Sequence, residues 1–229
     1  MNVVLVHGAG GTPVTWTEVA PVLRAAGHHV VAVTNPMTSL ADDVAHTAAA
    51  VRELPAPVVL VGHSYGGAVI TNAGREPGVK ALVYIAAFAP DEGETVNGIV
   101  ERYPPAEVTR FMHRGPNGEW FSEHTEQYYA EIAWDLAPAQ RAAWDGESRQ
   151  VSDLIYTQPT GTPAWRTVPS FYLVAADDKT LPPGIQRDMA ARAGMTVAEI
   201  EGSHFTPRVH PAAVAAFIEA AFAGKAGPA

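Results

Sequence analysis

The chain of 229 residues contains no cysteine, so disulfide bonds and a cysteine nucleophile are excluded. Basic residues are scarce. The chain has 15 Lys and Arg but 24 Asp and Glu, which gives a net charge of −9. That charge argues against nucleic acid and against an anionic membrane surface as partners. The longest uncharged apolar run, residues 81–89, is too short to span a bilayer. With 47% hydrophobic residues, the sequence predicts a soluble globular protein.

Metal ligands in a recognisable spacing are also missing. No group of His, Asp and Glu along the sequence is spaced as a ligand set, so we expect no metal. No internal repeat is visible, which leaves one domain with an insertion as the simplest organisation. Met1 and Asn2 lead directly into an apolar run with no signal peptide before it, so we expect a cytoplasmic protein.

Apolar runs alternate with helical segments in the first half of the chain. Helices are expected at about 14–25 and 40–53, and strands are expected at 2–6, 29–34, 57–62, 80–85, 169–176 and 196–201. Continuous Val, Leu and Ile runs are typical of strands buried on both faces, as in a parallel sheet. The pattern therefore predicts a doubly wound α/β fold with a mostly parallel, six-stranded sheet.

The pattern changes between residues 91 and 163. Clear buried strands disappear, aromatic residues cluster, and spacings such as Tyr128, Ile132 and Leu136 indicate amphipathic helices. We interpret 91–163 as a helical cap inserted into a core formed by 1–90 and 164–229. Most of its aromatic residues are expected to pack within the cap, and a few to line a pocket.

One motif in the sequence is typical of a catalytic serine. The run of valines and leucine at 58–61 leads directly into Gly62-His63-Ser64-Tyr65-Gly66, and a helical segment follows. Strand, Gly-x-Ser-x-Gly and helix in this order mark a nucleophile elbow, a tight turn that presents a serine hydroxyl at the sheet edge. The motif alone is a weak signal, so the partners of Ser64 have to be found.

A serine nucleophile needs a histidine base and an acid that orients it. Asp177 and Asp178 follow the expected strand 169–176, and His204 follows the strand 196–201. The order Ser, Asp, His after separate strands is the order expected for this type of elbow. His210 competes for the role of base, but it precedes Pro211 at a predicted helix start.

Two backbone N–H groups are needed to hold the oxyanion of an acyl-transfer intermediate. One should belong to Tyr65, which follows the nucleophile. The other should come from the glycine-rich loop His7-Gly8-Ala9-Gly10-Gly11 after the first strand, and Ala9 is our candidate. Neither phosphate-binding glycine motif is present in that loop.

With these residues the chain resembles the α/β-hydrolase superfamily. More narrowly, it is similar to the small cap-bearing group of plant methylesterases, plant hydroxynitrile lyases and related bacterial esterases. The resemblance covers nearly the whole chain. It rests on the motifs at 7–9 with Trp16, 62–67, 86–90, 164–170, 178–182 and on His204.

The resemblance implies ester hydrolysis through an acyl-enzyme, without metal or cofactor. In the family the acid usually stands four positions before a proline, which here is Pro182 and selects Asp178 over Asp177. Hydroxynitrile lyases of the group carry Thr directly after the first-strand His and Lys directly after the catalytic His. Here Gly8 and Phe205 occupy those positions, which favours esterase chemistry.

The sequence therefore predicts a serine hydrolase of small apolar carboxylic esters, with Ser64, Asp178 and His204 as catalytic triad. A hydroxynitrile lyase, a perhydrolase and a ligand receptor on the same fold remain alternatives. A small-molecule ester is the expected partner, and a homodimer is left open. The candidate pocket residues are Gly8, Trp16, Phe88, Trp120, Phe121, Tyr128, Trp134 and Phe205.

Overall fold

A six-stranded sheet forms the centre of the computed structural model, which describes residues 1–225. The strand order is β2-β1-β3-β4-β7-β8, and every neighbouring pair is parallel. The strands are β1 (Asn2–Val6), β2 (His29–Ala32), β3 (Val58–His63), β4 (Val79–Ile85), β7 (Ser170–Ala175) and β8 (Thr196–Ile200). The prediction of a six-stranded parallel α/β sheet is confirmed. The last four residues of the predicted core segment, 226–229, lie outside the described residues.

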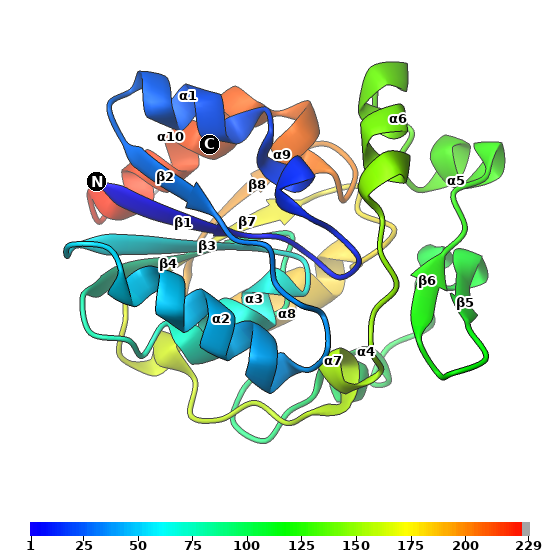
Figure 1. Cartoon of the computed structure of the whole chain (residues 1–229), viewed down its shortest axis with the longest axis horizontal. Helices are drawn as coiled ribbons and strands as arrows, with labels where there is room; N and C mark the ends of the chain where they lie inside the picture. Colours follow the sequence, from blue (N-terminus) through cyan, green and yellow to red (C-terminus); the bar gives the residue numbers. More distant parts are fainter. Residues whose placement is uncertain (226–229) are drawn as a thin grey trace.

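Helices cover both faces of this sheet (Figure 1). One face carries α1 (Val19–Ala25) and α10 (Pro211–Phe222), and the other carries α2 (Leu40–Arg52), α3 (Gly66–Ala73) and α8 (Pro183–Arg192). Two short helices, η1 (Pro13–Trp16) and α9 (Thr206–Val209), lie in the loops.

The prediction of one helix over residues 14–25 was wrong, because two shorter helices, η1 and α1, occupy this range. Pro21 explains the break. A continuous helix would need an N–H at this position to donate to Thr17, and proline has none. Pro21 is tolerated in the first turn of α1, where that N–H has no helical partner.

The strands are buried on both faces and feed two separate apolar cores. In β1, Val3 and Leu5 pack with α1 and α10, whereas Val4 and Val6 pack with α2 and α3. Side chains alternate along a strand, so a run without polar residues serves both layers. Strands buried in this way give the loops at their ends a rigid support.

The crevice of the sheet lies between the loops that follow β1 and β3. These strands are neighbours, but the chain continues from β1 to β2 on one side and from β3 to β4 on the other. Ligands of open parallel sheets bind at such a reversal, outside the carboxyl ends of the strands. The glycine-rich loop and the serine motif therefore meet at this point.

Between β4 and β7 the chain leaves the sheet and stands at the carboxyl ends of the strands (Figure 1). This excursion contains α4 (Val96–Val100), η2 (Glu107–Phe111), β5 (Met112–Arg114), β6 (Trp120–Ser122), α5 (Glu126–Glu131), α6 (Pro138–Glu147), α7 (Leu154–Thr157) and η3 (Ala164–Arg166). We keep the name cap segment for 91–163, whose boundaries remain a prediction. The antiparallel pair β5–β6 was not anticipated.

The middle of the cap segment has an apolar core of its own, in which Phe111, Tyr128, Tyr129 and Trp144 pack with Phe205 of the sheet domain. Its two ends instead join the core under α2 and α3. Among residues 1–225, no helix combines the length and the apolar character needed to cross a membrane.

Candidate active site

Ser64 lies in a sharp turn between β3 and α3. Its φ is +54°, in the left-handed region that a side chain disfavours. Two glycines make this turn possible. A Cβ on Gly62 would lie 2.5 Å from the carbonyl oxygen of Gly66, and a Cβ on Gly66 would lie 2.5 Å from that of Val6. The local sequence therefore determines the strained turn, as the elbow motif predicts.

His204 and Asp178 form a buried hydrogen-bonded pair. His204 Nδ1 lies 2.6 Å from Asp178 Oδ2, and both side chains are almost fully enclosed. The carboxylate is also bound by the N–H groups of Thr180 and Leu181, at 2.7 and 2.8 Å, and by Gln186 Nε2 at 2.9 Å. Four donors around a buried carboxylate fix the acid in one orientation. The acid in turn fixes the imidazole ring, with Nε2 free for chemistry.

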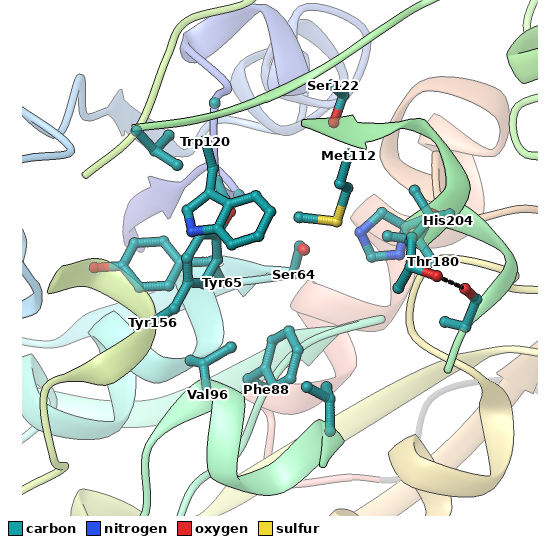
Figure 2. Close-up of a pocket in the computed structure, with 18 of the residues that line it drawn as sticks. Ser64, Tyr65, Phe88, Val96, Met112, Trp120, Ser122, Tyr156, Thr180 and His204 are labelled. Atoms are coloured by element: carbon teal, nitrogen blue, oxygen red, sulfur yellow. Dashed lines mark hydrogen bonds between the residues drawn. The ribbon is translucent and has the colours of Figure 1, made fainter. Parts of the chain in front are cut away.

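The Ser64 hydroxyl and the His204 ring face the same cavity (Figure 2). Within residues 1–225 the structure records no hydrogen bond from Ser64 Oγ, so the hydroxyl is free to turn toward an incoming group. Bonds between a catalytic serine and its base are often loose without substrate.

His63 supports the loop that carries His204. Its Nε2 lies 2.8 Å from the backbone oxygen of His204, and the two ring centroids are 4.6 Å apart. Burial, and after it the neighbouring His204, hold the pKa of His63 well below its usual range, so His63 stays neutral. Trp16 packs edge-on against His63, with the ring centroids 6.3 Å apart, and is fully buried. Its assignment to the pocket was wrong, because the ring belongs to the core under α1.

The two candidate oxyanion donors are available. The structure records no protein acceptor for the N–H groups of Ala9 and Tyr65 within residues 1–225. Gly8 brings the first loop close to Ser64, since a Cβ there would lie 2.8 Å from Ser64 Cβ. Tyr65 is held from behind, because its hydroxyl donates to Asp43 Oδ2 at 2.9 Å.

Asp43 is a buried carboxylate that the sequence did not reveal, because an aspartate in the first turn of a helix looks like an ordinary capping residue. Its Oδ1 accepts from the N–H of Met37 at 2.8 Å. Burial raises the pKa of Asp43 to about 6, although the hydrogen bonds from Met37 and Tyr65 act in the opposite direction.

The glycine-rich loop is held from both sides. His7 Nδ1 lies 2.8 Å from the carbonyl oxygen of Gly8, and His7 Nε2 accepts from the N–H of Asn35 at 3.1 Å. Burial lowers the pKa of His7 to about 4, so the ring is neutral near pH 7. A neutral ring can donate through Nδ1 and accept through Nε2 at once.

Arg149 of the cap segment is hydrogen-bonded to the same loop. Its guanidinium donates to the carbonyl oxygen of Gly11 from Nη2 and Nε, at 2.6 and 3.2 Å, and to that of Asn35 at 3.1 Å. Its own N–H donates to the carbonyl of Gly10 at 2.8 Å. No sequence signal singled out Arg149, because it lies in a polar stretch without periodicity.

The histidine loop is likewise held by two carboxylates. Asp135 of the cap segment accepts from the N–H and the hydroxyl of Ser203, at 2.7 and 2.6 Å. Asp177 is exposed and accepts from the N–H of Gly202 at 3.0 Å. Asp177 thus fastens the loop but does not contact His204, whereas Asp178 does.

A cavity of about 780 Å³ opens above Ser64, and we call it the Ser64 cavity. Figure 2 shows Met112, Trp120 and Tyr156 around the serine hydroxyl, with Phe88 and Val96 on the other side. Of the candidate pocket residues, six line the cavity, namely Gly8, Phe88, Trp120, Phe121, Tyr128 and Phe205. Its walls are mostly apolar, as in sites for small organic ligands.

Trp134 does not line the Ser64 cavity, so its assignment to the pocket was wrong. Trp134 comes after the end of α5 in the chain and lies on the surface, with 48% of the residue exposed. Trp134 was a candidate because aromatic residues cluster in the cap segment, but the chain turns after α5 and leaves the indole at the surface. In the part of the chain that the structure describes, no group of three or more His, Asp and Glu side chains could hold a metal ion.

Comparison with known proteins defines the class to which this fold and site belong. The Alpha/beta hydrolase family matches residues 3–217, and the chain belongs to this family. The resemblance noted from the motifs is therefore confirmed.

Comparison with individual relatives shows which members of the family the chain resembles. The chain is 33% identical over 122 residues to a carbendazim hydrolyzing esterase of Nocardioides, an alignment that covers 47% of the chain and 50% of that relative. It is 25% identical to methylesterase 1 of Arabidopsis thaliana over 219 residues, which is 81% of each protein. The relation to plant methylesterases is thus confirmed.

Among solved structures, a pyrethroid hydrolase from Sphingobium faniae superposes with a TM-score of 0.80 at 22% identity. The superposition covers 96% of the chain and 98% of the hydrolase. At this identity the likeness shows the shared fold.

Proposed function

We propose that the chain is a serine hydrolase that cleaves small, mostly apolar carboxylic esters through an acyl-enzyme. One observation carries the proposal. A histidine fixed by a buried carboxylate at 2.6 Å faces, across an apolar cavity floor, a serine held in a strained turn. Relatives described as esterases support the ester class.

In the first half-reaction Ser64 Oγ attacks the ester carbonyl carbon while His204 Nε2 takes the serine proton. The carbonyl oxygen becomes an oxyanion, and the N–H groups of Ala9 and Tyr65 hold it. When the tetrahedral intermediate collapses, the bond to the alcohol oxygen breaks. His204 gives its proton to that oxygen, the alcohol leaves, and the acyl group stays on Ser64.

In the second half-reaction water takes the place of the alcohol. His204 removes a proton from the water, whose oxygen attacks the acyl carbon and forms a second oxyanion in the same site. Collapse breaks the bond to Ser64 Oγ, which regains its proton from His204, and the carboxylic acid leaves. Asp178 remains ionised throughout and stabilises the imidazolium that forms twice.

The nucleophile is tested by chemical labelling and by substitution. A serine-directed phosphonate should label Ser64 stoichiometrically, and Ser64→Ala should lower kcat on aryl esters by a factor on the order of 10⁴–10⁶. Mass spectrometry of the labelled protein and an ester panel of varied acyl and alcohol length measure both. Label on another serine, or near-normal turnover by the variant, would refute the proposal.

Cyanohydrin cleavage is the competing reaction on such a site, and it needs a cation beside the departing cyanide. Phe205 occupies the expected place and packs edge-on against Trp144 at 5.1 Å. The Arg149 guanidinium also lines the cavity but is bonded to loop carbonyls. An anion in this apolar environment would be costly.

The wild-type protein should therefore hydrolyse aryl esters and release negligible cyanide from mandelonitrile. Serine-dependent cyanide release faster than ester turnover would move the chain to the lyases. Peroxyacid formation from acetate and hydrogen peroxide at a higher rate would indicate a perhydrolase. Tight ligand binding with at most one turnover would indicate a receptor.

A further inference from the structure

The cap segment contains a second histidine–aspartate pair, away from the one at Ser64. His124 Nδ1 lies 2.9 Å from Asp145 Oδ1. The hydroxyl of Tyr129 also donates to Asp145 Oδ1, so two donors hold this carboxylate oxygen. The proposed ester hydrolysis leaves this pair without a role.

His124 is enclosed although its acid is not. Its side chain is 9% exposed, against 46% for Asp145. The imidazole lies against the ring of Tyr128 at 4.7 Å between centroids, with Trp144 at 6.3 Å. The histidine lines the Ser64 cavity and Asp145 does not. Aromatic packing and the hydrogen bond together keep the ring in one orientation.

The hydrogen bond also decides which nitrogen can bind a ligand. Nδ1 must carry the proton that it donates to the Asp145 carboxylate, so Nε2 of the neutral ring presents a lone pair. Burial lowers the pKa of His124, although Asp145 acts against this effect, and the neutral form is favoured near pH 7. Within residues 1–225, the structure records no hydrogen bond to Nε2.

The direction of that lone pair follows from the ring. Nε2 points well away from Nδ1 on an imidazole, and Nδ1 is bound to the surface carboxylate of Asp145. Since His124 lines the cavity and Asp145 does not, Nε2 is the ring nitrogen available to a ligand in the cavity, where most of the wall is apolar. A few polar groups among apolar walls are what fix the orientation of a bound ligand.

We propose that His124 determines substrate specificity by accepting, at Nε2, a hydrogen bond from a hydroxyl or N–H group on the ester. The substrate class is then an ester that carries a hydrogen-bond donor on its acyl or alcohol part, remote from the scissile carbonyl. This inference rests on the proposed ester hydrolysis and extends it. An ester without a donor leaves a buried acceptor unpaired, and such a loss discriminates strongly.

Matched esters test the acyl side and the alcohol side separately. The acyl set is the 4-nitrophenyl esters of 3-phenylpropanoic, 3-(4-hydroxyphenyl)propanoic and 3-(4-methoxyphenyl)propanoic acids. The alcohol set is the butanoates of 2-phenylethanol, 2-(4-hydroxyphenyl)ethanol and 2-(4-methoxyphenyl)ethanol. The methoxy compounds accept but do not donate, so they separate donor recognition from size and polarity.

The wild-type protein should prefer the hydroxy ester in at least one set, by on the order of tenfold in kcat/KM over both analogues. His124→Phe should bring this ratio close to one, because the acceptor is lost while a ring is kept. His124→Gln retains a carbonyl acceptor and should keep part of the preference. It also serves if the phenylalanine variant does not fold.

His113 provides a matched control. It is another cap histidine paired with a carboxylate, Glu123 at 3.1 Å, but its side chain is 43% exposed and does not line the cavity. His113→Phe should therefore keep the wild-type ratio. Circular dichroism and thermal melts compare the folding of all variants.

Equal rates for hydroxy and plain esters in both sets would overturn the inference, as would a hydroxy preference that persists in His124→Phe or is undiminished in His124→Gln. Both results leave Ser64-dependent hydrolysis standing. Absence of any Ser64-dependent hydrolysis would instead defeat the proposed function. In that case, titration of the same esters into Ser64→Ala measures their affinities without turnover. Equal affinities for the hydroxy esters and their analogues would also overturn the inference.

Discussion

The guanidinium of Arg149 donates two hydrogen bonds to the carbonyl oxygen of Gly11, at 2.6 and 3.2 Å. The two residues are far apart in the sequence. The bond ties the cap segment to the loop whose Ala9 N–H is proposed to hold the oxyanion. The cap segment is thus hydrogen-bonded to the proposed catalytic centre as well as covering it.

Arg149→Met should lower kcat by a factor on the order of 10–10², with a smaller change in KM, because an oxyanion donor that is no longer held loses its advantage in the transition state. Steady-state kinetics on an aryl ester gives the split. Arg114→Met is the control, since Arg114 pairs with Asp153 at the surface. Equal effects of the two substitutions would show that Arg149 acts only on general stability.

The two adjacent aspartates should differ sharply. Asp178→Asn should reduce kcat by up to about 10⁴, because an amide cannot orient and stabilise the imidazolium of His204 as a carboxylate does. Asp177→Asn should change kcat less than about tenfold, since the Asp177 carboxylate accepts from the Gly202 N–H and does not contact His204. Kinetics of both variants under the same conditions decides, and the opposite ranking would transfer the role to Asp177.

Gly8→Ala should impair catalysis without unfolding the protein. The added Cβ would lie 2.8 Å from Ser64 Cβ and 3.3 Å from its Oγ, so either the loop or the serine must move. A displacement of this kind should lower kcat by about tenfold or more. Gly146→Ala in α6 is the matched control, because a Cβ there meets nothing within 4 Å. Unchanged kcat in Gly8→Ala would show that the loop is not held as tightly as the contacts indicate.

Acid should destabilise the fold through His7. Its pKa is lowered to about 4 by burial, so the unfolded state binds the proton more strongly than the folded state. The stability contributed by the neutral ring is complete above about pH 6.5 and is lost as the pH falls toward 4. The loss approaches about 3 kcal/mol.

Urea unfolding at pH 7 and pH 4.5 measures this effect. His7→Asn removes the titrating group and should show a smaller drop in the free energy of unfolding between the two pH values. Titrating groups that do not interact with His7 contribute equally to both proteins and cancel in the comparison. A drop of the same size in the variant would exclude His7 as the acid-sensitive group.

Much of the fold, and the position of the proposed nucleophile Ser64, follows from local sequence. The continuous apolar runs of β1, β3 and β4 can be satisfied only by burial on both faces, and the glycines around Ser64 permit one turn geometry. The residues of the proposed triad, Ser64, Asp178 and His204, each follow a strand. Parallel strands end at one edge, so residues of this kind meet there without further information.

Tertiary structure decided what the cap segment does. Within it Trp134 lies on the surface, whereas Arg149, Asp135 and His124 reach the loops of the candidate site or the cavity. Outside the cap segment, tertiary packing also buries Trp16 in the core. The cap segment has short helices and loops, and the direction of each side chain depends on contacts with residues distant in the sequence. Period and spacing describe one element at a time, and therefore do not predict which charged side chains bridge two of them.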